Sequence, residues 1–184
     1  YTVNVNGSSS TSATTTNTTG INFNNLSLRT SVITNAQSCT LSSPICVVND
    51  FSIDNYGAGV TKGIANLLSN TAYLNKNITI NGYSPSGTTT FQLQGTGTWS
   101  ENNTLTAGAT GFGLSNPIVI NTTGTITLGS FVGLRSGSIT YTAGTLTTTG
   151  FGMRITQSTI TGFGSGNLFI ETLYHTSTGA LAAA

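Results

Sequence analysis

The sequence predicts an all-β fold, and three observations support that prediction. Short apolar clusters alternate with polar residues at a period of two, which is typical of half-buried strands. Threonine and the β-branched residues, which favour pleated sheets, are abundant. From Trp99 onward, short apolar pairs such as Ile118/Ile120 and Ile126/Leu128 recur between glycine-rich turns. Many short strands separated by turn signals predict a β-sandwich or a barrel.

The first 20 residues fall into two segments that differ from the rest of the chain. Residues 1–6 alternate apolar and polar side chains, as one strand with one apolar face. The apolar members are Tyr1, Val3 and Val5. Residues 7–20 are almost all Ser and Thr and have nearly nothing to bury. We therefore expect a strand at 1–6, a linker at 7–20 and one β domain at 21–184.

Between residues 21 and 98 the pattern is again mostly that of strands. Apolar residues alternate with Asn, Ser and Thr around Leu26, Phe51 and Ile78. One stretch has helical spacing instead, with apolar side chains at Val60, Ile64, Leu67 and Leu68. A short amphipathic helix or turn is expected there.

The tetrapeptide Thr-Gly-Phe-Gly occurs at 110–113, 149–152 and 161–164. The intervals of 39 and 12 residues are unequal, whereas a β-solenoid is recognised by a fixed period. The unequal spacing argues against a solenoid. It favours a fold in which each Phe anchors a turn or a strand edge, with Gly permitting close approach of the backbone.

The composition indicates an extracellular protein. Only nine residues are charged, whereas 58 are Ser or Thr and 19 are Asn. Because acid denaturation acts mainly through paired carboxylates, such a chain offers little for low pH to disrupt. Five scattered cations form no basic patch, which excludes a nucleic-acid-binding protein. No apolar run is long enough to span a bilayer, and a start at Tyr1 rather than Met fits a chain whose signal peptide has been removed.

Cys39 and Cys46 flank a turn-forming Ser-Ser-Pro sequence that can bring their Cα atoms together. In an extracellular chain such a pair favours a disulfide, and two free buried thiols are the alternative. No other Cys and a single His accompany them, so no zinc site, other metal or cofactor is expected.

Few residues could support catalysis. His175 is the only imidazole, and Ser177 follows it without a nearby orienting acid or a nucleophile-turn motif. Glu101 and Glu171 are the right residue type for a glycosidase pair, but neither lies in a motif that fixes their separation. The sequence therefore predicts no catalytic residue and a protein that is not an enzyme.

Asp50 and Asp54 lie far enough apart to share one face of a strand. Calcium prefers such oxygen ligands, but the segment lacks the spacing of an EF-hand loop. A hydrogen-bonded strand end is the favoured interpretation, with an ion site as the alternative.

Six Asn-x-Ser/Thr sequons are candidates for N-glycosylation. They begin at Asn6, Asn17, Asn25, Asn77, Asn102 and Asn121. Chance alone gives about this many in a chain so rich in Asn, Ser and Thr, so the number is not informative. The expectation of N-glycans depends instead on the extracellular composition and on a surface with few charges to keep it hydrated.

An isolated strand, a hydroxyl-rich linker and an all-β body without catalytic residues describe a subunit that adds its first strand to a neighbour. In strand addition, Tyr1, Val3 and Val5 would fill pockets in the neighbour's core. Repeated head to tail between copies of the chain, the contact builds a helical homopolymer.

In this layout, over its whole length, the chain resembles the donor-strand pilins, and among them the glycosylated thread filament subunits of Sulfolobus-type archaea. The resemblance implies an Ig-like, pilin-like β-sandwich completed by the strand of a neighbouring subunit. It also implies a cell-surface filament with a role in adhesion, biofilm formation or cell contact.

Two other classes stay open. A β-rich viral fibre or capsid protein can also be rich in Thr and Gly and poor in charge, but a fibre protein would form a closed trimer rather than an open polymer. A secreted carbohydrate-binding module would present exposed aromatic side chains, and Trp99 is the only tryptophan.

Overall fold

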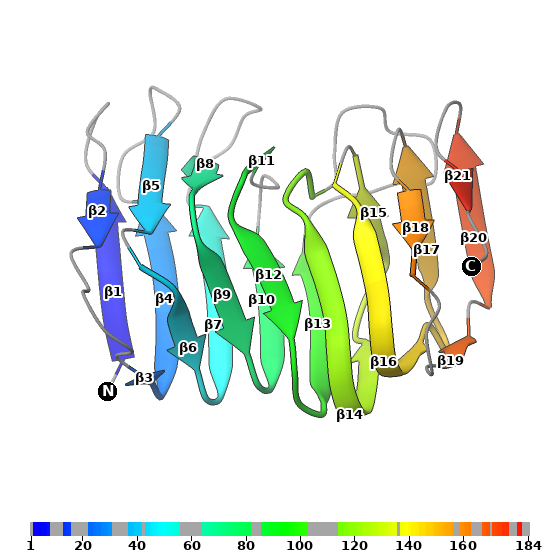
Figure 1. Ribbon diagram of the computed structural model, residues 1–184. Helices are drawn as coiled ribbons and strands as arrows, with labels where there is room; N and C mark the ends of the chain where they lie inside the picture. Colours follow the sequence, from blue (N-terminus) through cyan, green and yellow to red (C-terminus); the bar gives the residue numbers. More distant parts are fainter. Residues whose placement is uncertain are drawn as a thin grey trace.

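The computed structural model describes residues 2–7, 13–15, 22–30, 37–41, 43–55, 64–81, 86–102, 114–135, 137–156, 159–162, 167–169, 171–176 and 180–181. Within these ranges every regular element is a β-strand, which confirms the all-β prediction. No helix long and apolar enough to cross a membrane occurs among them. The strands are stacked nearly in sequence order, from β1 at one end of the molecule to β20 and β21 at the other (Figure 1).

The bounds of the strands are β1 (Thr2–Gly7), β2 (Ala13–Thr15), β3 (Asn22–Phe23), β4 (Asn25–Thr30), β5 (Gln37–Leu41), β6 (Ile45–Val47), β7 (Asp50–Asn55), β8 (Ile64–Leu68), β9 (Thr71–Leu74), β10 (Asn77–Asn81), β11 (Ser86–Gly87), β12 (Thr90–Leu93), β13 (Gly97–Asn102), β14 (Ile118–Leu128), β15 (Val132–Leu134), β16 (Ile139–Thr147), β17 (Gly152–Thr156), β18 (Thr159–Thr161), β19 (Asn167–Phe169), β20 (Thr172–Thr176) and β21 (Ala180–Leu181).

The chain forms a coil whose successive turns pair through parallel strands. The coil has three sides. On the first side β3, β6, β9 and β12 are neighbours, and on the second side β1, β4, β7, β10 and β13 are neighbours. The third side carries β2, β5, β8 and β11, and in the later turns β15, β17 and β20. The 11-residue strand β14 pairs with β12 at its start and with β13 at its end, and thereby joins the first two sides into a 14-stranded sheet.

This coil differs from the expected β-sandwich. Ig-like and pilin-like sandwiches are built from antiparallel strands, whereas the pairings between the described strands are parallel, as in a β-solenoid. The sequence argued against a solenoid because its repeats had no fixed period. A solenoid whose turns differ in length has no fixed period either. Paired positions are 19 residues apart between Ala72 and Phe91 but 29 apart between Trp99 and Leu128.

Rows of side chains at equivalent positions of successive turns make up the core. One row on the second side, buried throughout, consists of Leu26, Phe51, Ile78, Trp99 and Leu128. A row on the first side consists of Ile45, Ala72, Phe91, Ile118, Ile139 and Ile160. The two sides meet where the rings of Phe51 and Phe91 lie with centroids 5.6 Å apart. Such a pair contributes about 0.5–1.5 kcal/mol beyond its burial.

The helix predicted around residues 60–68 is wrong where the structure describes that stretch. Residues Ile64–Leu68 form β8, which pairs with both β5 and β11, and Leu67 is buried. Val60 lies outside the described ranges. The parallel ladder on both edges outweighs a weak local helical preference.

The strand predicted at residues 1–6 is present as β1, and Tyr1 lies outside the described residues. It pairs with β4 of its own chain, with Val3 beside Leu26 and Val5 beside Leu28. Within the predicted linker, Ala13–Thr15 form β2 and pair with β5. The donor strand is therefore not confirmed, because β1 already has a partner in the same chain.

Gly97 allows two turns to approach closely, which generates a first prediction. A Cβ at Gly97 would lie 1.7 Å from the carbonyl oxygen of Lys76 in the preceding turn. We expect Gly97→Ala to lower the free energy of unfolding by about 3 kcal/mol, since backbone must move. The control is Gly150→Ala, where φ is +81° but no atom lies within 4 Å, so the loss should be about 1 kcal/mol. Equal losses in urea denaturation would contradict this packing.

Tyr141 is a buried polar group that ties β16 to the next turn. Its residue is fully buried, and its hydroxyl lies 2.5 Å from the Gly144 carbonyl oxygen and 2.6 Å from that of Asn167. Burial raises the pKa of Tyr141, and backbone hydrogen bonds at Leu146 and Asn167 partly oppose this. Because the unfolded side chain ionises near pH 10, the stability from Tyr141 is complete below about pH 10 and is lost as the pH rises further.

Tyr141→Phe should therefore have two effects. At neutral pH the free energy of unfolding should fall by about 1–3 kcal/mol, because a part-buried carbonyl oxygen loses its donor. Between about pH 9 and 11, the stability of the variant should decline less steeply than that of the wild type. Urea denaturation at a series of pH values measures both, and identical slopes would show that Tyr141 does not carry the alkaline sensitivity.

Candidate functional site

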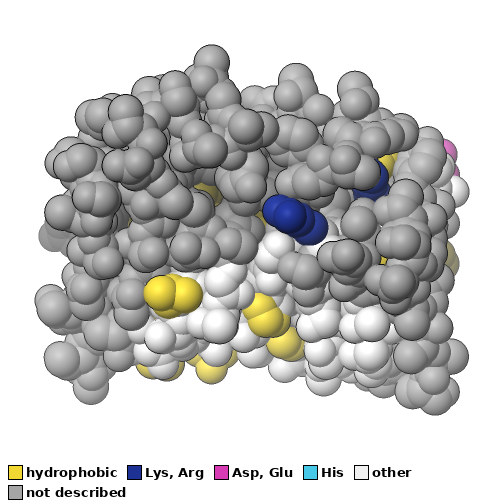
Figure 2. Space-filling model, turned by 90° about the horizontal axis from the view of Figure 1, so that it is seen from above, with side chains coloured by type: hydrophobic (Ala, Val, Ile, Leu, Met, Phe, Trp, Pro, Cys, Tyr) yellow, Lys and Arg dark blue, Asp and Glu magenta, His cyan; other side chains and the backbone are white. Residues whose placement is uncertain are grey.

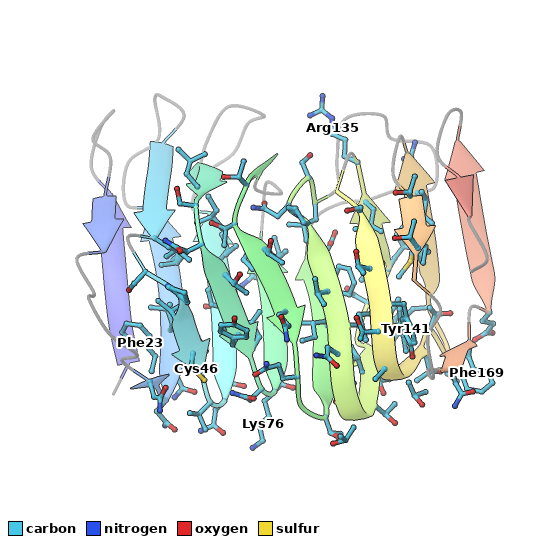
Figure 3. The ribbon with its side chains drawn as sticks, in the orientation of Figure 1. Phe23, Cys46, Lys76, Arg135, Tyr141 and Phe169 are labelled. Atoms are coloured by element: carbon cyan, nitrogen blue, oxygen red, sulfur yellow. The ribbon has the colours of Figure 1, made fainter. Side chains whose placement is uncertain are left out.

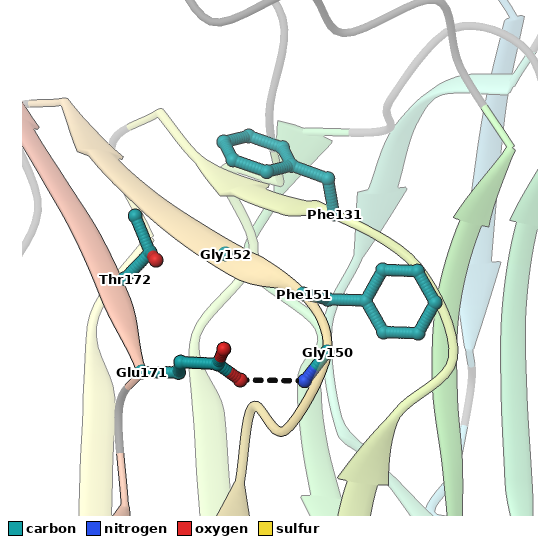
Figure 4. Close-up of a pocket in the computed structure, with 6 residues that line it drawn as sticks. All are labelled: Phe131, Gly150, Phe151, Gly152, Glu171 and Thr172. Atoms are coloured by element: carbon teal, nitrogen blue, oxygen red, sulfur yellow. Dashed lines mark hydrogen bonds between the residues drawn. The ribbon is translucent and has the colours of Figure 1, made fainter.

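A surface groove lies where the later turns pass from the second side to the third side (Figure 4). Its volume is about 160 Å³, and it is lined by Phe131, Gly150, Phe151, Gly152, Glu171 and Thr172. These residues come from three successive turns, at or just before the starts of β15, β17 and β20. The groove is thus assembled by the stacking of turns and not by one local motif.

Short hydrogen bonds fix the carboxylate of the groove. Gly150 adopts a positive φ of 81°, which favours glycine, and its N–H donates to Glu171 Oε2 at 2.6 Å. The N–H of Glu171 donates to Thr148 Oγ1 at 2.7 Å. Glu171 is therefore held at the edge of the groove by the preceding turn, although its side chain is exposed.

Two phenylalanines border the groove. Phe151 is 41% exposed and Phe131 is half-buried, and Figure 4 shows the ring of Phe131 leaning over the start of β17. Phe151 belongs to the Thr-Gly-Phe-Gly copy at 149–152 and lies at a turn, in the position expected for that tetrapeptide. Phe112 and Phe163, from the other copies, lie outside the described residues.

Sequence reasoning did not associate Phe131, Phe151 and Glu171, although a signal was present. The last turns do repeat at nearly constant length, since Leu134 pairs with Ile155 and Ile155 pairs with His175. Phe131, Phe151 and Glu171 are 20 residues apart in the sequence, so a repeat of about 20 residues, sought in this half of the chain alone, would have placed them side by side.

Glu101 and Glu171 lie in different environments. Glu101 is buried, beside Ile80 in the register of the second side. Its Oε2 accepts the Gly133 N–H at 3.2 Å, and its backbone N–H donates to Ser130 Oγ at 2.6 Å. Glu101 therefore fixes the turn between β14 and β15, whereas Glu171 lies exposed in the groove.

Asp50 lies in a ladder of hydrogen bonds that crosses four turns. Its N–H donates to Asn25 Oδ1 at 3.1 Å, and its Oδ1 accepts from Asn77 Nδ2 at 2.8 Å. Asn77 Oδ1 in turn accepts the Thr98 N–H at 2.9 Å. This arrangement agrees with the hydrogen-bonded strand end, and Asp54 occupies the other end of β7. Among the described side chains no three His, Cys, Asp or Glu residues gather as metal ligands.

His175 lies in β20, paired in register with Ile155 of β17. Ser177, the other member of the Ser–His pair considered from the sequence, lies outside the described residues.

Cys46 is a free cysteine, so the predicted Cys39–Cys46 disulfide is not formed in this structure. Cys46 lies in β6 between buried residues, and Asn75 Nδ2 donates to its sulfur at 3.2 Å. Cys39 lies in β5, whose neighbours are β2 and β8. The intervening turn thus moves the chain from the third side to the first and separates the two backbones.

The sequons occupy different environments. Asn121 is exposed in β14, next to an irregularity in its pairing with β16. Asn25 and Asn77 are half-buried members of the hydrogen-bonded ladder. Asn6 lies in β1 and Asn102 in β13, and Asn17 lies outside the described ranges.

The described surface has few charges. Lys76 and Arg135 project at opposite edges of the molecule (Figure 3), and Figure 2 shows Lys and Arg side chains as isolated groups on the face viewed from above.

No protein-family model matches this chain, and no curated protein or solved structure is detectably similar to it. Its function must be inferred from the coil, from the ends of the coil and from the groove.

Asn121 is the sequon that we expect to carry a glycan, because its side chain is exposed and free of the ladder that holds Asn77. Glycopeptide mass spectrometry of native material should find sugar on Asn121, and Asn121→Gln should remove one discrete mass increment. Asn77→Gln serves as the control and should leave the glycan mass unchanged. An unmodified Asn121 in native protein would contradict this assignment.

Proposed function

We propose that the protein is a structural subunit of an extracellular, glycosylated filament in which copies stack head to tail through the ends of the coil. One observation carries the proposal: the strands at each end of the described coil have a neighbour on one side only. These strands are β1, β2 and β3 at one end and β19, β20 and β21 at the other. Unpaired strand edges are templates for pairing with another chain.

The parallel order of the strands supports a defined polarity of assembly. If the last turn of one copy pairs with the first turn of the next, every new pair is parallel, as within the coil. Joining two like ends through a two-fold axis would reverse the strands. A heterologous contact that continues the same ladder does not close, so it produces an open filament.

Two forms of this filament differ in where β1 pairs. In the stacked form β1 stays on β4 of its own chain and presents its outer edge to the next copy. In the donor-strand form β1 leaves that position and occupies the same row in a neighbour. We favour the stacked form, because β1 is already paired with β4 of its own chain along its whole length, from Thr2 beside Asn25 to Gly7 beside Thr30.

The composition supports a structural role outside the cell. The chain has only nine charged residues, and its described part contains no group of three or more His, Cys, Asp or Glu side chains that could hold a metal ion. Polymers of this kind serve in adhesion, biofilm formation or cell contact, which are the roles we propose.

Val3→Asp should block assembly and Asn4→Asp should not. Position 3 pairs with buried Leu26, so a carboxylate there enters the apolar row at a cost of several kcal/mol, whereas position 4 pairs with half-exposed Ser27. Electron microscopy and sedimentation of each purified variant measure the polymer. Normal filaments from Val3→Asp, or equal loss in both variants, would refute the proposed register.

A disulfide between positions 4 and 27 distinguishes the two forms. These positions pair in register, and the spacing of neighbouring strands, about 4.8 Å, suits a disulfide. In a background with Cys39→Ser and Cys46→Ser, oxidised filaments of Asn4→Cys/Ser27→Cys should run as monomers on a non-reducing gel. A ladder of covalent oligomers would establish the donor-strand form instead.

The viral-fibre alternative gives a different result in solution. A fibre protein would sediment as a closed trimer whose mass does not change with concentration. Head-to-tail stacking predicts a distribution of lengths that grows with concentration.

A further inference from the structure

We propose that the groove bordered by Phe131 and Glu171 binds the guanidinium group of an arginine side chain presented by a partner protein. The groove includes Thr172 of β20 and so borders the last turn of the coil, but the binding test below does not depend on filament assembly.

The shape of the groove suits a flat group. In the parallel register Gly152 pairs with Thr172, and Phe131 lies beside Gly152, one position before the Val132–Met153 pair. Neighbouring strands are about 4.8 Å apart, so the backbones on either side of Gly152 are separated by about 10 Å. Glycine places no side chain in that interval, so a planar group that stacks on the ring of Phe131 there would meet backbone and no side chain of β17.

The charge of the groove suits a cation. Glu171 Oε2 accepts the Gly150 N–H at 2.6 Å, and Figure 4 shows the other carboxylate oxygen pointing away from that N–H. The residues that line the groove include no Lys or Arg, so the carboxylate is the only charged group among them. A neutral ligand such as a sugar could use the ring and the carboxylate but would gain nothing from this charge.

A guanidinium group combines both properties. It is planar and always charged, it stacks on aromatic rings, and it donates paired hydrogen bonds to a carboxylate. An ammonium group is a compact point charge and cannot fill a flat slot in the same way. The volume of about 160 Å³ accommodates a side-chain head group and leaves the rest of the ligand outside, which fits an arginine that projects from a partner's surface.

The test uses the whole chain labelled with ¹⁵N and titrated with N-acetyl-arginine-N-methylamide. Amide shifts should change and saturate at Gly150, Phe151, Gly152 and Thr172, with a Kd in the millimolar range. The citrulline analogue has the same shape without the charge and should bind at least about tenfold more weakly, since a charge-assisted contact is lost. The lysine analogue should also bind more weakly.

Matched variants separate binding at the groove from other effects. Glu171→Gln retains an acceptor for the Gly150 N–H but loses the charge, so arginine affinity should fall about tenfold. Phe131→Leu should also weaken binding. Phe169→Leu is the control, because Phe169 is 60% exposed but does not line the groove. The comparison of arginine with citrulline on the wild-type chain requires no variant to fold.

Equal affinity for the arginine and citrulline analogues would overturn the proposal. So would shifts that persist unchanged in Glu171→Gln, or shifts that appear only with methyl glucoside, which would assign the groove to a saccharide. None of these outcomes affects filament assembly, which is measured separately.

Discussion

Parallel backbone pairing between successive turns is the constraint on which the rest of this structure depends. Apart from the strands at the edges of the sheets, each strand is bonded to one strand of the preceding turn and one of the following turn, so equivalent positions form rows along the coil. A slip of one residue would move every inward side chain to the outer face. This is why Leu26, Phe51, Ile78 and Trp99, which lie in four different turns, are all buried and all in register.

Polar side chains extend the same constraint where regular strands end. At the corner between the first and second sides, Asn49 Nδ2 donates to Asn24 Oδ1 at 2.8 Å, and its backbone N–H donates to the Asn24 carbonyl oxygen at 2.8 Å. Asn116 Nδ2 donates to the Thr89 carbonyl oxygen at 3.1 Å from a buried position. Amide ladders of this kind continue the hydrogen bonding of the sheet through corners that backbone groups cannot span alone. The abundance of Asn, Ser and Thr thus has a structural role in addition to hydration.

The sequence predicted strand positions well, because alternation reports directly which side chains of a strand are buried. Leu26, Phe51 and Ile78 were recognised in this way. Alternation does not report which strand is the neighbour, however, and turns of unequal length between the paired residues concealed the solenoid. The free state of Cys46 was missed for a related reason. A short connection suggested proximity, but it carries the chain around a corner of the coil.

The groove was the part least accessible from sequence. The sequence indicated that Gly150 and Gly152 permit a close turn. The position of the Glu171 carboxylate, however, depends on the preceding turn, because the Gly150 N–H donates to it. Phe131 and Thr172 become opposite walls only because Gly152 lies between them in the register. A site composed of three turns has no local motif, so it becomes visible only when the stacking is known.

The parallel register is tested most directly by nuclear Overhauser contacts between methyl groups in a selectively Ile-labelled chain. The structure predicts strong contacts between Ile53 and Ile80 and between Ile139 and Ile160, which are paired in register and buried. Antiparallel strands, by contrast, bring opposed α-protons together at close pairs. Strong cross-strand contacts between α-protons, without the Ile53–Ile80 contact, would contradict the coil and restore the sandwich.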